Sequence, residues 1–286
     1  MKKQKLFLGL WAMMCLAAAS SCGITVNRVE TGPMRTEQLD IAKPADATQA
    51  WDVELQPGAA SVKIDVGGDK LVDGSIEYNV DDWKPIITNA SRHVVIRQNG
   101  FIGVPPTNVR NDWKVRLGKG IPMNLTISTG AIRGSLDVGG LSLRTFTYRQ
   151  GAADSTLSLS QSNVGEMSSF NIDAGASRLT AQGLAYMNAA SGKINIGAGA
   201  ITLIFDGKLT RDLEVTIDGG AAAVTIDSGG NPVQVILNQG LSAVTAKDWK
   251  RADRTYNSPE WASAKGAKVI VRANLSAASL TLESGK

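Results

Sequence analysis

The stretch "LEVTIDGGAAAVTID", residues 213–227, places two short runs of alternating apolar and polar residues on either side of a glycine and alanine cluster. Such alternation is typical of β-strands that bury one face. The same arrangement recurs at "FNIDAGASRLTAQ" from 170, "KINIGAGAITLIFD" from 193, "VQVILNQGLSAVTA" from 233 and "VIVRANLSAASLTLE" from 269. A small pattern used this often predicts a repeat protein.

Two earlier copies start at Val53 (VELQPGAASVKID) and Leu125 (LTISTGAIRGSLDV). A small residue marks the centre of each copy, and we expect it to form a sharp turn that favours positive φ. These residues are Gly58, Gly130, Gly175, Gly199, Gly220, Gly240 and Asn274. One unit has too little apolar surface to fold alone, so neighbouring units must stack around a shared core.

The predicted core is aliphatic and comes from the alternate positions of the repeats. It comprises Ile172, Leu179, Ile194, Ile196, Ile201, Leu203, Val215, Ile217, Val224, Ile226, Val235, Leu237, Val244, Val269, Val271, Leu280 and Leu282. The predicted fold class is therefore all-β, a parallel stacked-strand β-solenoid with an N-terminal β unit.

The N-terminus has the features of a secretory signal: three lysines, then the apolar run "LFLGLWAMMCLAAA" and the small residues "ASSCG". The last segment resembles a bacterial lipobox, which predicts that residues 1–21 are a signal peptide, helical only in the precursor. Cys22 would then be lipidated and anchor the chain to a bacterial membrane, at the outer membrane or the cell surface. The alternative is an ordinary secretory signal with Cys22 unmodified.

Residues 22–45 mix polar residues with Pro and Gly and are interpreted as a tether. We expect an N-terminal β domain over 46–120 and the stacked repeat domain over 121–286. Residues 247–268 interrupt the last two copies and would form an excursion that caps the open end of the stack.

The net charge argues against a nucleic-acid partner. The whole chain carries a formal +4, and removal of residues 1–21 takes away three lysines and no acid, which leaves +1. Such a balance offers no strong attraction to a polyanion over the molecule as a whole.

The sequence offers no catalytic residue, metal site or cofactor motif. The chain has a single histidine, His93, so no second histidine is present to complete a zinc site. No nucleophile motif accompanies it either, so a structural role is expected for His93. Aspartates follow many predicted strands: Asp65, Asp137, Asp173, Asp206, Asp218 and Asp227. We expect them to accept hydrogen bonds from turn amides. A pair of them serving a polysaccharide-processing enzyme is a remote alternative, and Ca²⁺ binding has weaker support still.

The tripeptide Asp-Trp-Lys occurs three times, around Trp83, Trp113 and Trp249, and Trp261 adds a further indole. These residues could form a platform on which indoles stack against sugar rings. The alternative is that the rings close the ends of the apolar stack.

Two segments carry a resemblance to a known family. "AWDVELQPGAASVKIDVGGDKLVDGSIEYNVDDWKPIIT", from residue 50, resembles the N-terminal domain of the toast-rack family of bacterial envelope proteins. "TYNSPEWASAKGAKVIVRANLSAASLTLE", from residue 255, is similar to the stacked-strand region of that family and of LiaF-like and adhesin-like proteins. The resemblance implies an all-β fold of parallel stacked strands and an extracytoplasmic location, and it brings no established enzymatic activity and no catalytic residues.

Together these observations predict a non-enzymatic, envelope-anchored lipoprotein that acts as a scaffold, adhesion or envelope-sensing module. Its partners would be the membrane, through the N-terminal lipid, and an envelope protein or glycan. Glycan or peptidoglycan binding through the tryptophans is the alternative function.

Overall fold

The structure, a computed structural model, describes residues 30–99, 108–238 and 243–285. Eighteen strands within these ranges join into one sheet, and the helical elements there are two short 3₁₀ turns, η1 (Asp81–Trp83) and η2 (Leu184–Met187). The predicted all-β class is confirmed. The predicted signal peptide and Cys22 lie outside the described residues.

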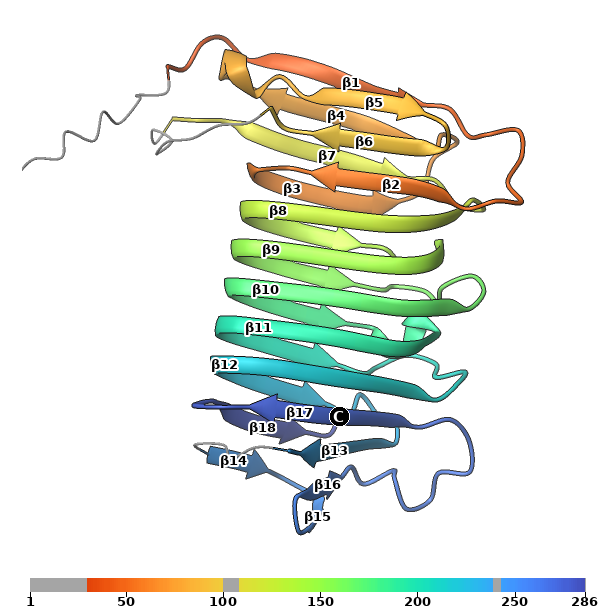
Figure 1. Cartoon of the computed structure of the whole chain (residues 1–286), viewed down its shortest axis with the longest axis vertical. Coiled ribbons are helices and arrows are strands. Elements are labelled where there is room, and N and C mark those ends of the chain that lie inside the picture. Colours follow the sequence, from red (N-terminus) through yellow and green to blue (C-terminus); the bar gives the residue numbers. More distant parts are fainter. Residues whose placement is uncertain (1–29, 100–107, 239–242, 286) are drawn as a thin grey trace, which may run out of the picture.

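Five long parallel strands form the middle of the molecule (Figure 1). They are β8 (Pro122–Asp137), β9 (Ser142–Ser158), β10 (Met167–Gln182), β11 (Ala189–Ile204) and β12 (Leu213–Asp227). Each strand bends near its middle, so its first half belongs to one face of the stack and its second half to the opposite face (Figure 1). The links between consecutive strands lie at the edge opposite the bend.

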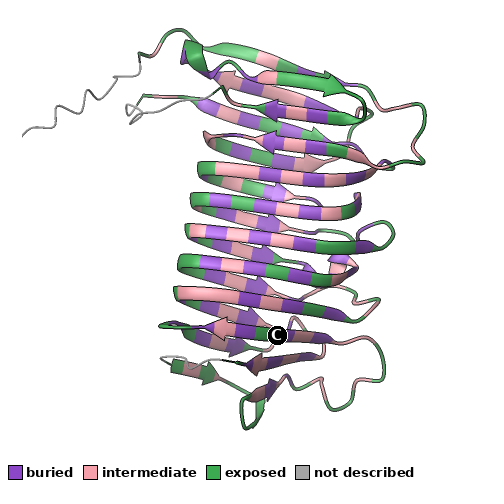
Figure 2. Ribbon diagram, viewed as in Figure 1, coloured by how far each residue is buried: buried purple, intermediate pink, exposed green. Residues whose placement is uncertain are grey.

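Alternation along each strand builds the core between the two faces. In β12, Leu213, Val215 and Ile217 are buried before the bend, and Val224 and Ile226 are buried after it. Figure 2 shows the resulting bands of buried residues across successive strands. All of the predicted core residues are buried except Val244, which is half-buried because its strand pairs with a single neighbour among the described residues.

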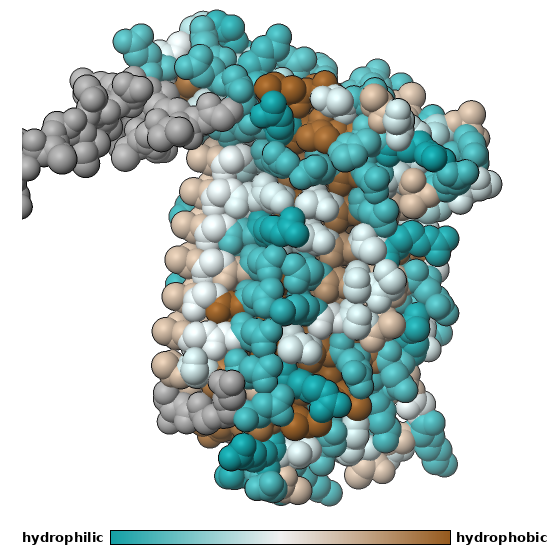
Figure 3. All heavy atoms as spheres, viewed as in Figure 1, coloured by the Kyte–Doolittle hydropathy of each residue, from teal (hydrophilic) through white to brown (hydrophobic). Residues whose placement is uncertain are grey.

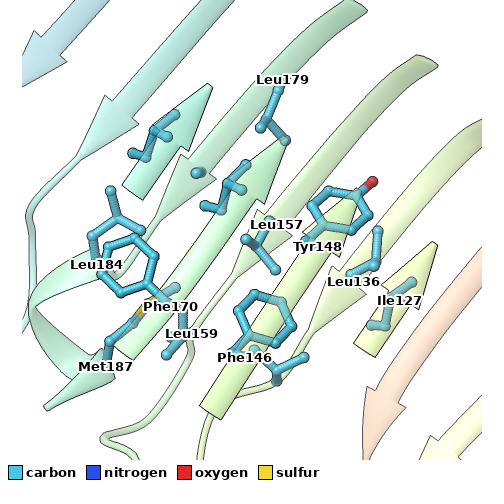
Figure 4. Packing of buried hydrophobic residues seen from close by; sticks show 14 of the residues in the cluster. Ile127, Leu136, Phe146, Tyr148, Leu157, Leu159, Phe170, Leu179, Leu184 and Met187 are labelled. Carbon is cyan, nitrogen blue, oxygen red and sulfur yellow. The ribbon is translucent and has the colours of Figure 1, made fainter. Parts of the chain in front are cut away.

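Aromatic side chains fill the core near its middle. Phe146, Tyr148 and Phe170 lie among leucines such as Leu157 and Leu179 from neighbouring strands (Figure 4). Since a fully buried aliphatic side chain contributes about 1.5–3 kcal/mol, a continuous column of this kind stabilises the stack without a disulfide.

The N-terminal end adds further layers to the same stack. β2 (Trp51–Gln56) and β3 (Ala59–Val66) pair in parallel with β8, and β6 (His93–Arg97) and β7 (Asn111–Leu117) lie outside them. Three antiparallel strands, β1 (Arg35–Ile41), β4 (Val72–Tyr78) and β5 (Ile86–Ala90), close this end. Pairing is therefore continuous across residue 120, where the sequence suggested a domain boundary.

Part of the predicted tether is a strand. Residues 35–41 form β1, paired with β4 from Arg35 opposite Tyr78 to Ile41 opposite Val72. Only Leu39 and Ile41 of this strand are buried, so its sequence pattern is too short to recognise. The tether interpretation was wrong for these seven residues.

The C-terminal end does not follow sequence order. β17 (Val269–Leu275) and β18 (Ser279–Glu283), the last strands of the chain, lie between β12 and the strands β13 (Val233–Leu237) and β14 (Ala243–Ala246). The intervening residues 247–268 contain β15 (Lys250–Ala252) and β16 (Thr255–Asn257). β16 pairs antiparallel with β13 at the outer end of the stack.

Candidate functional site

A column of glycines runs along the bend of the stack. Strand register places Gly130, Gly151, Gly175, Gly197 and Gly220 at the same position of successive strands, each next to the backbone of the one before. A Cβ on Gly175 would lie 2.8 Å from the carbonyl oxygen of Gly151, and one on Gly151 would lie 2.7 Å from that of Gly130. Close backbone approach therefore requires glycine at positions 151 and 175.

The expectation of positive φ at the bend was wrong for most of the copies. Of the predicted corner glycines that the structure describes, only Gly199 has a positive φ, 122°, and Gly199 lies two residues beyond the column. Gly240 lies outside the described residues. The sequence also gave no reason to include Gly151, which stands in a less regular copy.

The glycine column leaves an open groove along the bend, because its positions have no side chains. The groove has a volume of about 640 Å³, and its polar lining comes from Thr129, Arg149, Gln150, Asp173, Asn195 and Asp218. Four of these residues, Arg149, Asp173, Asn195 and Asp218, occupy the position two residues before the glycines. Figure 3 shows a column of hydrophilic side chains along this face.

The polar side chains beside the groove hydrogen-bond to one another across strands. Asn195 Nδ2 donates to Asp173 Oδ1 at 2.5 Å, and Arg149 Nε donates to Asp173 Oδ2 at 3.3 Å. One strand farther, Asn274 Nδ2 donates to Asp218 Oδ1 at 2.7 Å, and Asn238 Nδ2 donates to Asn274 Oδ1 at 2.9 Å. These cross-strand hydrogen bonds form a polar ladder, which connects strands that are far apart in the sequence.

Two of the candidate carboxylates, Asp173 and Asp218, share this groove. They lie two strands apart with Asn195 between them, which corresponds to about 9–10 Å at the usual strand spacing. A glycosidase acid usually sits among apolar groups that keep it protonated. Here each carboxylate instead accepts an amide hydrogen bond and lies near a cation, Arg149 or Lys193. These contacts give each carboxylate a structural role.

Three other aspartates bind turn amides, as their positions after strands predicted. Asp137 Oδ1 accepts from Gly139 N at 2.9 Å and from Ser160 N, on the next turn of the stack, at 3.1 Å. Asp227 Oδ1 accepts from Gly229 N at 2.9 Å, and Asp206 Oδ1 accepts from Gly183 N at 2.5 Å. Asp65 pairs with Lys63 at the surface, 3.0 Å away.

His93 begins strand β6 at the surface, with half of its side chain exposed. Its Nε2 lies 3.9 Å from Glu54 Oε2, and the side chain is distant from the groove in strand order. No group of three or more His, Cys, Asp or Glu is placed to hold a metal ion within residues 30–99, 108–238 and 243–285.

The tryptophans do not form an exposed platform. Trp83 and Trp113 are each 1% exposed and lie in the N-terminal layers, whereas Trp249 is 7% exposed and lies next to β15 at the other end. Trp113 Nε1 donates to Asn111 Oδ1 at 2.9 Å. Trp261 is half-buried under Lys268, whose Nζ is 4.6 Å from the ring centroid. The hypothesis of a shared glycan platform is therefore wrong, because the rings close opposite ends of the core.

A buried polar cluster lies behind the groove. The Tyr148 hydroxyl donates to Gln150 Oε1 at 2.8 Å, and Ser155 Oγ donates to the same oxygen at 2.6 Å. Burial raises the pKa of the Tyr148 hydroxyl to about 12. The sequence analysis missed this cluster and most of the polar ladder. The positions of Arg149, Gln150 and Asn195 relative to their neighbours become visible only when the copies are aligned in register.

Comparison with known protein families identifies the family of this chain. Residues 30–182, just over half of the chain, match the family described as the N-terminal domain of toast_rack, DUF2154. The chain therefore belongs to the toast-rack family. The match begins before β1 and ends with β10, inside the long-strand stack.

Among solved structures, the chain is similar to a "putative cell adhesion protein" from Clostridium sporogenes ATCC 15579. The two share 17% identity with a TM-score of 0.47, over 88% of this chain and 99% of the other. No curated protein matches the sequence. Within the described residues, no helix is both long and apolar enough to cross a membrane.

Proposed function

We propose that this protein is a non-enzymatic lipoprotein of the cell envelope that presents its rigid stack as a scaffold or adhesion surface. The observation that supports this most directly is the open form of the site. The groove over the bend lies on the outer surface of the stack, and a second groove there is lined by small residues such as Ala131 and Ala152. Such surfaces suit contact with an extended partner.

The roles of the candidate catalytic groups also support a non-enzymatic function. The turn aspartates hold backbone amides, and the groove aspartates hold asparagine amides. Each carboxylate thus has a structural task of its own. Membership of the toast-rack family, together with the resemblance noted in the sequence, agrees with an envelope role.

Anchoring rests on the lipobox-like segment that ends at Cys22. Stable attachment needs more than one acyl chain, because each buried CH₂ contributes only about 0.8 kcal/mol. Replacement of Cys22 by Ala should move the protein from the membrane fraction to the released fraction. Incorporation of a radiolabelled fatty acid into the unmodified chain, and its loss from the variant, would establish the modification; continued membrane attachment of the variant would contradict it.

The scaffold role is tested by capture of partners in intact cells. A photo-crosslinking amino acid at Ala152 or Ala198, both exposed beside the bend, should capture an envelope component. The same label at Ser160, on the opposite edge, is the matched control. Equal yields at all three positions would argue against a specific contact along the bend.

Polysaccharide processing is the second candidate, since Asp173 and Asp218 have a separation compatible with an inverting glycosidase. We expect no turnover of envelope polysaccharides by the purified protein. A turnover that disappears in both Asp173→Asn and Asp218→Asn, with the fold intact, would overturn the non-enzymatic proposal.

A further inference from the structure

The end of the stack farthest from β1 concentrates the positive charge of the molecule. Residues 247–268 contain the six bases Lys247, Lys250, Arg251, Arg254, Lys265 and Lys268, against the three acids Asp248, Asp253 and Glu260. The segment, named here the basic tip, therefore has a formal charge of +3. Because residues 22–286 carry +1 in total, everything outside the tip carries −2. The whole-chain charge hides this asymmetry.

The basic side chains of the tip are available to a partner. Lys247, Lys250, Arg251, Arg254 and Lys265 are all exposed, and within the described part of the chain none of them forms an ion pair. Elsewhere bases are often neutralised across strands, as Arg116 is by Asp73 and Lys70 is by Asp40, 2.8 Å away. The lower end of the molecule in Figure 3, where the tip lies, is mostly hydrophilic.

The framework of the tip is fixed to the core. β16 pairs with both β13 and β15, and the buried ring of Tyr256 lies 5.6 Å below the Arg251 guanidinium. The Ser258 hydroxyl accepts from Val233 N at 3.1 Å and donates to the carbonyl of Asn231 at 3.2 Å. Because this backbone is already ordered, a partner needs to order only the exposed side chains.

The tip points away from the N-terminal attachment. Eleven strand-to-strand steps separate β5 from β15 along one face, which is about 50 Å at the usual spacing. β1, the first strand of the described chain, lies at the other end (Figure 1). A chain anchored through its N-terminus would thus present the tip to whatever lies beyond the membrane.

We propose that the basic tip binds an acidic polysaccharide. The exposed bases of the tip are spread over residues 247–265, and separated positive charges of this kind suit a polymer with repeated anions. A membrane-inserting tip would show large exposed apolar side chains, but those of the described chain are Met34, Ile87 and Val164, outside the tip. Stacking on nucleic-acid bases would need free ring faces, whereas Tyr256 is buried and Trp261 lies under Lys268.

This proposal rests on the envelope location proposed above, and its test is independent of that location. The full chain, purified in detergent, is titrated with polygalacturonate, with uncharged dextran of similar length as control. Binding to polygalacturonate should weaken as salt is raised from about 50 to 300 mM, because exposed charges are screened. Lys247→Gln, Lys250→Gln, Arg254→Gln and Lys265→Gln together should weaken it by about tenfold or more.

A second variant removes the same charge from other exposed sites: Lys84→Gln, Arg133→Gln, Arg144→Gln and Lys208→Gln. It should retain binding within about twofold of the unmodified chain. Equal losses in both variants would overturn the proposal, since the charge would then act diffusely. Tighter binding to anionic phospholipid vesicles or to duplex DNA than to polygalacturonate would overturn it as well. Correct membrane fractionation with failed polysaccharide binding would leave the anchoring proposal intact.

Discussion

Leu213 and Val233 pair with opposite sides of the same residue, Val269. Val269 comes after both of them in the sequence, yet its strand lies between their strands. The last strands of the protein are thus inserted between two earlier neighbours. A similar insertion occurs at the other end, where β2 and β3 lie between β8 and the later strands β6 and β7. Coils near the ends of the chain are therefore covered on both sides, which protects them from fraying.

Hydrogen exchange should reveal this insertion. Amides of β17, paired with both β12 and β13, are expected to exchange at least about tenfold more slowly than those of β14, which within the described residues pairs with β18 alone. Measurement of exchange by mass spectrometry on the full chain would compare the two strands directly. Equally fast exchange in β17 would show that the C-terminal strands leave the stack readily.

The geometry of the glycine column predicts that replacing a glycine by alanine lowers the free energy of unfolding by different amounts at different positions. Gly175→Ala should lower the free energy of unfolding by about 1–3 kcal/mol, because its Cβ would lie 2.8 Å from the Gly151 carbonyl oxygen. Gly220→Ala is the matched control in the same column, since its nearest contact would be 3.4 Å. Denaturant unfolding of both variants tests the difference. A similar loss in both would mean that close approach is not what the column requires.

Trp113 should matter for stability far more than Trp261. Trp113→Ala removes a fully buried ring and its hydrogen bond to Asn111, with an expected cost of about 3–5 kcal/mol. Trp261→Ala removes a half-buried ring and should cost less than about 2 kcal/mol. Thermal unfolding followed by circular dichroism would compare them. A Trp113→Ala variant of normal stability would contradict the burial described above.

Replacement of the aspartates at strand ends is expected to lower the free energy of unfolding by amounts that depend on their contacts. Asp137→Ala removes two hydrogen bonds to backbone amides, one of them from the neighbouring turn, and should cost about 1–2 kcal/mol. Asp65→Ala removes only a surface ion pair with Lys63 and should cost less than about 0.5 kcal/mol. Urea denaturation at neutral pH provides the measurement, and the reverse order of the two costs would exclude the structural role assigned to Asp137.

Stability should fall at high pH through Tyr148. Burial raises the pKa of its hydroxyl to about 12, above the value of about 10 in an unfolded chain. As pH rises, Tyr148 therefore loses its hydroxyl proton first in the unfolded state. The contribution of Tyr148 to the free energy of unfolding is complete below about pH 10 and is lost as pH rises towards 12. A shift of this size corresponds to about 3 kcal/mol.

Tyr148→Phe isolates this effect. The variant should show a shallower loss of stability between pH 10 and 12 than the unmodified chain. It should also be about 1–2 kcal/mol less stable at neutral pH, because Gln150 and Ser155 lose a buried partner. Parallel pH curves for the two proteins would show that Tyr148 ionises as freely when folded as when unfolded.

The sequence by itself determined the all-β class and the aliphatic core, because alternation of apolar residues around a small central residue is a local property. Ile194 and Ile217, for example, could be assigned inward from their own neighbours. The turn role of Asp137 and Asp227 was predictable for the same reason.

Only the tertiary structure decided the features that depend on pairing between distant strands. The insertion of Val269 beside Leu213, the meeting of Asp173, Asn195 and Asp218 along one groove, and the burial of Trp83 and Trp113 in one end layer all require strand register. Register is set by contacts across the whole stack, and local patterning cannot specify which copy lies next to which.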